Sequence, residues 1–141
     1  MTLLSPLGAA IAELTADTAV KAITTRIRGV EPIPGDALGP GKYLAFVVVT
    51  QLDAAPMAHM GVRETTLGIR AYDATYALAE ALWLACEAVF LDRGARVADS
   101  GLGIYHSQVQ ASGTPDRDPD TKQPLFHGIV SYPTTIGAVP A

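Results

Sequence analysis

Cysteine and basic residues are both scarce in this chain. Cys86 is the only cysteine among 141 residues, which excludes an intrachain disulfide and leads us to expect assembly in an intracellular, reducing compartment. Lys and Arg together number 10 against 14 Asp and Glu, giving a net charge of −4. Non-specific binding to nucleic acid or to an anionic membrane needs clustered positive charge, so the composition argues against both.

Charged and aromatic residues are sparse as well, at 17% and 6%, whereas hydrophobic residues make up 49%. Such a chain is too apolar to be disordered, and surface that one domain cannot bury is usually covered by partners. Glu80 and Glu87 interrupt the longest apolar stretch, and the first seven residues lack the basic start of a secretory signal. We therefore expect a soluble, single domain over residues 1–141, with no membrane span and no secretory signal.

The apolar periodicity predicts a short helix and several strands. Ser5 is a suitable N-cap, Pro6 suits the first helical position, and the helical pattern ends near Asp17. A helical turn is expected after residue 20. The predicted strands span residues 26–30, 43–50, 61–72, 103–110 and 125–136. Within the strand at 61–72, alternation directs Leu67, Ile69 and Ala71 toward the core.

A long helix is predicted from residue 74 to residue 91, with Asp73 as N-cap and Gly94 as the left-handed residue after its end. Its apolar residues form two stripes: Tyr76, Ala79, Trp83, Cys86 and Phe90, and Leu78, Leu82, Ala85 and Val89. A helix that rests on a sheet needs one apolar face. We therefore expect the second stripe to pack against something else, with a neighbouring subunit as the candidate.

Loops are predicted at residues 31–42, 51–60 and 113–124. The first contains three prolines and three glycines, and its length exceeds what a connection requires. It is therefore a candidate contact arm.

The acidic run at residues 116–120 begins like a calcium-binding loop, but Thr121 stands where glycine is required and His127 where a glutamate is required. A solvated turn whose Asp side chains cap backbone amides fits better. The three histidines lie in separate segments, and Cys86 falls in the middle of the apolar helix. We expect no metal, no cofactor and no enzymatic activity.

Three motifs follow one another in a distinctive order. A strand runs into the long helix as LGIRAYDATYALA at residues 67–79, the segment GLGI follows at residues 101–104, and the loop RDPDT at residues 117–121 precedes Pro124 and the closing strand. In this order, from about Leu7 to Ile136, the chain resembles the tail terminator (tail completion) proteins of long-tailed bacteriophages.

The resemblance implies an α+β subunit: a small, mostly antiparallel sheet of about four strands, with the long helix and the short N-terminal helix packed on it. It implies a hexameric ring that caps the tail tube, stops its polymerisation and provides the head-joining surface. The implied partners are other copies of the chain, the tail tube protein and a head-completion or connector protein, while DNA passes through the lumen without specific binding. The implied location is the head–tail junction of the virion, after assembly in the host cytoplasm.

The candidate subunit or partner contacts come from the first loop, from the second stripe of the long helix and from the acidic loop. They are Pro34, Asp36, Leu38, Leu78, Leu82, Val89, Arg117, Asp118 and Asp120. Other functions stay open. They are another neck protein (a head-completion or head–tail adaptor subunit), a tail tube subunit, or a small-ligand-binding or hotdog-like enzyme domain, which would also place a long helix against an antiparallel sheet.

Overall fold

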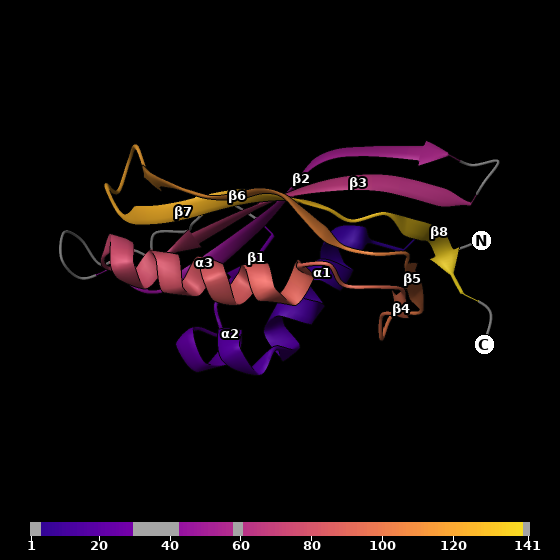
Figure 1. The fold of residues 1–141 in the computed structure, drawn as a ribbon, viewed down its shortest axis with the longest axis horizontal. Helices are drawn as coiled ribbons and strands as arrows, with labels where there is room; N and C mark the ends of the chain where they lie inside the picture. Colours follow the sequence, from indigo (N-terminus) through magenta and orange to yellow (C-terminus); the bar gives the residue numbers. More distant parts are fainter. Residues whose placement is uncertain (1–3, 30–42, 58–60, 140–141) are drawn as a thin grey trace.

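The computed structural model describes residues 4–29, 43–57 and 61–139. The described residues form an α+β domain in which helices cover one face of a curved, mixed sheet (Figure 1). The loop arm at residues 31–42, with Pro34, Asp36 and Leu38, lies outside the described residues. Among the helices that the structure does describe, none is long and apolar enough to cross a membrane.

Two short helices begin the chain. In α1 (Pro6–Ala16) the Ser5 hydroxyl accepts a hydrogen bond from the Gly8 amide at 2.9 Å, which confirms the predicted cap. Asp17 ends α1 and also caps α2 (Thr18–Ile23), because its carboxylate accepts from the Val20 amide at 3.0 Å. The two helices therefore meet at a sharp corner with no intervening loop.

Eight strands form the sheet within the described residues: β1 (Ile27–Arg28), β2 (Phe46–Met57), β3 (Val62–Tyr72), β4 (Arg96–Val97), β5 (Leu102–Ile104), β6 (Gln108–Arg117), β7 (Pro124–Ser131) and β8 (Thr134–Ala138). β1 lies parallel to β2, and the other pairings are antiparallel. The sheet branches at β3, which pairs with β7 along most of its length and with β8 at Val62 and Arg63. One branch continues from β7 to β6, and the other from β8 through β5 to β4.

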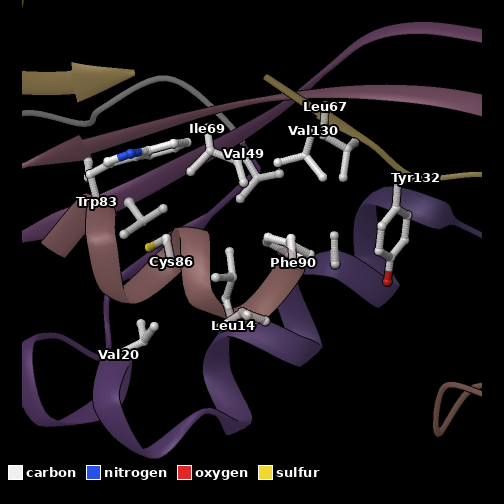
Figure 2. Packing of buried hydrophobic residues seen from close by; sticks show 14 of the residues in the cluster. Leu14, Val20, Val49, Leu67, Ile69, Trp83, Cys86, Phe90, Val130 and Tyr132 are labelled. Carbon is white, nitrogen blue, oxygen red and sulfur yellow. The ribbon is translucent and has the colours of Figure 1, made fainter. Parts of the chain in front are cut away.

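The helix α3 (Tyr76–Phe90) lies across the sheet and builds the main core with it (Figure 2). Leu67, Ile69 and Ala71 are fully buried, as their alternation predicted. A second, smaller cluster lies among residues that alternate to the other face, where the Phe46 and Tyr72 rings stack at 4.3 Å between centroids. β2 is therefore buried on both faces at its start, where Phe46, Val47, Val48 and Val49 follow one another.

The structure has more strands than the sequence predicted, and the bounds of two loops and two strands were wrong. The expected loop at 51–60 is strand as far as Met57, because β3 offers backbone partners as far as Val62. The expected loop at 113–124 is strand as far as Arg117, which pairs with Pro124. The expected strands at 103–110 and 125–136 are each broken in the middle, at residues 105–107 and 132–133.

Both ends of the long helix also differ from the prediction. Thr75 is the N-cap and its hydroxyl accepts from the Leu78 amide at 3.2 Å, whereas Asp73 is buried and accepts from the Ala74 amide. The Asp73 amide donates to the carbonyl of Pro124, so Asp73 belongs to the end of the sheet and the helix begins later. Past the other end, the residue with positive φ is Asp92, at 46°, and Gly94 is not needed for the turn.

Candidate interaction surfaces

The helix α3 has two faces of opposite exposure. Its buried residues are Ala79, Leu82, Trp83, Cys86, Val89 and Phe90. On the other side, small and apolar residues are exposed at alternating spacings of four and three; we call them the α3 outer stripe, and they are Ala77, Ala81, Leu84, Ala88 and Leu91. Leu84 is 53% and Leu91 51% exposed. Large apolar side chains so open to solvent, in one row, mark a surface that a partner can cover.

Of the three α3 residues that were predicted as subunit contacts, two do not lie on the surface of the subunit. Leu82 and Val89 are buried in the core of the subunit itself, so they do not reach its surface. The reason is that the second apolar stripe of α3 is covered by the same chain: Leu14 of α1 and Val20 of α2 pack into the same cluster (Figure 2). Leu78 is 49% exposed, and its contact role stays a prediction.

The acidic loop is held by one of its own side chains. The Asp118 carboxylate accepts hydrogen bonds from the amides of Asp120 and Thr121, both at 2.9 Å. The Asp118 amide donates to the Gln123 carbonyl, and the Asp118 carbonyl accepts from the Lys122 amide. Asp118 is buried by these contacts, so its role is to shape the turn. The predicted capping of backbone amides by Asp is confirmed here.

Arg117 and Asp120, the other two candidates in this region, are exposed. The Arg117 guanidinium lies 5.4 Å from the centroid of the Tyr76 ring and donates to the Lys122 carbonyl at 3.0 Å. The acidic loop is thus tied to the start of α3, although the two are far apart in sequence. Contact with a partner at Arg117 or Asp120 stays a prediction.

A groove of about 560 Å³ lies beside the loop. Gly68 and Leu52 line it, next to Ile129 of β7, while Arg70 and His127 add polar groups. Because Leu67 and Ile69 point toward the helices, Gly68 between them faces the opposite side of the sheet. The groove therefore opens on the side that α1, α2 and α3 do not cover.

A buried polar network joins α1 to the second branch of the sheet. Glu13 accepts hydrogen bonds from Arg96 at 2.5 and 2.9 Å and from the Tyr132 hydroxyl at 2.5 Å, and it forms an ion pair with Arg93 at 3.0 Å. Burial and the hydrogen bond to Glu13 raise the pKa of Tyr132 well above its usual range. A polar cavity of about 330 Å³ adjoins the network. Among the described residues, each partner of the Glu13 carboxylate is a cation or a hydroxyl donor, as expected of a structural carboxylate.

The side chain with the most reactive chemistry is out of reach of solvent. Cys86 is fully buried, and burial, with a smaller contribution from Asp17, raises the pKa of its thiol to about 12. Cys86 therefore packs as a small buried hydrophobic residue. In residues 4–29, 43–57 and 61–139, no group of three or more His, Cys, Asp or Glu could hold a metal ion. His59, one of the three histidines, lies outside these ranges.

Comparison with known proteins gives a structural match. No protein family and no curated protein matches the chain in sequence. Among solved structures, one chain of the virion of a native gene transfer agent particle matches with a TM-score of 0.60 and 16% sequence identity. The match covers 92% of this chain and 93% of that one. At this identity the likeness is one of fold, and it extends over nearly the whole of both chains.

Proposed function

We propose that this chain is a structural protein of a virion and, within the virion, the tail terminator. Copies of the chain would form a ring on the growing end of a tail tube. The ring would prevent addition of further tube subunits and present a surface for a head-completion or connector protein. DNA would pass through its lumen without specific binding.

The observation that carries the proposal is the end-to-end fold similarity to a virion chain, at a TM-score of 0.60 over 92% of the sequence. A match of this extent concerns the whole architecture and not one common motif. The order of motifs from the strand at 67–79 to the loop at 117–121, which resembles tail terminators, supports the narrower assignment. Fold alone does not define a function, so both supports are needed.

The proposed mechanism is geometric and involves no covalent chemistry. The subunit must bind the tube end more tightly than another tube subunit does, while its opposite face must offer nothing that a tube subunit can extend. A net charge of −4 suits a channel for DNA, because few cations are present to hold the phosphates. The exposed Arg117 and Asp120, on a loop of fixed shape, are the proposed contacts along the ring axis.

Deleting the gene from the phage or prophage that encodes it tests the proposal. The lengths of the tails in the lysate are measured by negative-stain electron microscopy, with a strain that carries the wild-type gene on a plasmid as control. We expect overlong tails without heads, and normal particles in the control. Tails of normal length beside unattached heads would instead assign the chain to the head side of the joint, as another neck protein.

The contact role of the acidic loop is tested in the same strain. Complementation with Arg117→Glu and Asp120→Lys together should fail to restore normal tails, whereas Glu64→Lys, an exposed acid on β3, should restore them. Asp118 is left unchanged because it shapes the turn. Normal assembly with the double variant would remove the loop from the mechanism.

A further inference from the structure

The exposed surface of α3 carries charge of one sign only. Between Thr75 and Leu91 the charged residues are Glu80 and Glu87, and no Lys or Arg occurs. Both acids lie in the helix that presents the α3 outer stripe, and Glu80 is exposed. Within the described residues neither acid has an ion-pair partner. Beyond the first turn of the helix, where Arg117 lies over the Tyr76 ring, the α3 surface is therefore apolar and negatively charged.

This charge argues against pairing of α3 with α3 of another copy. In such a symmetric contact the same patch lies on both sides, so Glu80 and Glu87 would face their own counterparts. Like charges opposed across an interface are unfavourable. The partner of the α3 outer stripe must instead offer apolar surface and positive charge.

The segment that contains α2 offers both. Besides two threonines, its exposed residues have apolar or basic side chains; we call these residues the α2 face, and they are Ala19, Lys21, Ala22, Ile23 and Arg26. From Thr18 to Gly29 the charged residues are Lys21, Arg26 and Arg28, so the segment carries positive charge alone. Ile23 is 39% exposed, and neither Lys21 nor Arg26 has an ion-pair partner in the described part of the chain.

We infer that the α3 outer stripe of one copy docks on the α2 face of the next copy, with Glu80 and Glu87 opposite Lys21 and Arg26. The two patches are different surfaces of one chain, so the contact is head-to-tail and can be repeated around a closed ring. This inference deepens the proposed function, on which it rests, by naming the two surfaces that join the ring subunits. It replaces Leu82 and Val89 with Leu84 and Leu91 as the apolar contacts from α3.

Charge reversal tests the pairing directly. One variant carries Glu80→Lys and Glu87→Lys, and another carries Lys21→Glu and Arg26→Glu. A matched control carries Glu64→Lys and Asp99→Lys, which reverse the charge of two exposed acids outside both patches. Circular dichroism checks that each purified full chain is folded. Mass photometry and sedimentation velocity then give the mass of the assemblies at several concentrations.

We expect rings for the wild type and the control, and more than about tenfold weaker assembly for each double variant alone. An equal mixture of the two double variants should form rings again, because alternating copies restore opposite charges at every contact. Restoration on mixing is a result that damage to either fold could not produce. Rings of unchanged stability in either double variant, a mixture that stays monomeric, or a wild type that stays monomeric would overturn the inference.

The failure of this inference is distinguishable from the failure of the proposed function. If deletion of the gene gives overlong tails but charge reversal leaves the ring intact, the chain is a terminator joined by other surfaces. If charge reversal dissociates the ring but deletion leaves tail length normal, the interface stands and the terminator role falls.

Discussion

At the scale of single residues, two glycines make room for the one tryptophan. Trp83 is buried under β6 and β7, and a Cβ atom added at Gly113 or at Gly128 would overlap its indole ring. A Cβ at Gly128 would also lie 2.7 Å from the Ala111 carbonyl oxygen, on the backbone of β6. Because neither the ring nor the strand can withdraw easily, this contact requires glycine.

We therefore predict that Gly128→Ala lowers the free energy of unfolding by about 1–3 kcal/mol through overpacking. Urea denaturation monitored by tryptophan fluorescence measures the change. Gly94→Ala is the matched control, since a Cβ there would meet nothing within 4 Å, and its effect should stay within about 0.5 kcal/mol. Equal stability of the two variants would contradict the packing argument.

Glu13 supports a second residue-scale prediction. Its carboxylate faces two guanidinium groups and the Tyr132 hydroxyl while its side chain is 12% exposed. Replacing it with Gln removes the negative charge but keeps the shape, and should destabilise the fold by about 2 kcal/mol. The same substitution at exposed Glu64 should change the stability by less than about 0.5 kcal/mol, as chemical denaturation can check.

Cys86 and Tyr132 make stability depend on alkaline pH. Burial raises the pKa of Cys86 from 9.0 to about 12, and that of Tyr132 is raised above 10.0. The unfolded chain therefore loses these protons at lower pH than the folded chain, so the stabilisation is complete below pH 9 and is lost as the pH rises above it. Urea denaturation from about pH 8 to pH 11 should show this decline.

The variant Cys86→Ala provides the control for the pH dependence. It lacks the thiol, so its free energy of unfolding should fall less steeply than that of the wild type between pH 9 and pH 10, where Tyr132 contributes little. The comparison is one of slopes, because the loss of the sulfur also changes stability at every pH. Identical slopes would show that Cys86 does not couple folding to protons.

At the scale of elements, α3 carries on opposite sides the residues that build the core and those that we propose as contacts with another copy. Leu82 points into the core and Leu84, two positions later, points to solvent. Leu82→Ala should cost about 2–5 kcal/mol of stability, whereas Leu84→Ala should leave the stability of the monomer within about 0.5 kcal/mol of the wild type. Thermal denaturation of monomeric samples measures both. A comparable loss in Leu84→Ala would mean that the outer stripe serves the fold and not a partner.

The strands show what sequence patterns could predict. Alternation at Leu67, Ile69 and Ala71 gave the buried face of β3 correctly, because burial on one side imposes a period of two. The ends of β2 and β6 were missed because their final residues are polar or small and are ordered by backbone pairing with a neighbour. Such pairing depends on register across the sheet, which leaves no local signal.

At the scale of the whole molecule, the order of the long helix and the main strands was predicted, whereas β4, the division of the last two predicted strands and the branching of the sheet were not. At residues 132–133 the chain passes from β7 to β8, which pair with different parts of β3, and there the Tyr132 hydroxyl donates to Glu13 of α1, a contact remote in sequence. The covering of the second stripe of α3 by α1 and α2 also arises from contacts remote in sequence. This explains why Leu82 and Val89 were assigned to a surface, while Leu84 in its alanine-rich surroundings was overlooked.

Because Cys86 is buried, the rate at which its thiol is chemically labelled reports on motions of the folded protein. A thiol-specific reagent can modify the single cysteine only when α3 separates from the core, so labelling of the native protein reports the frequency of that opening. Because the docking surface proposed for the next subunit lies on the opposite side of the same helix, labelling should slow when subunits associate. The labelling rate of this one thiol can thus report both the opening of the fold and the proposed association of subunits.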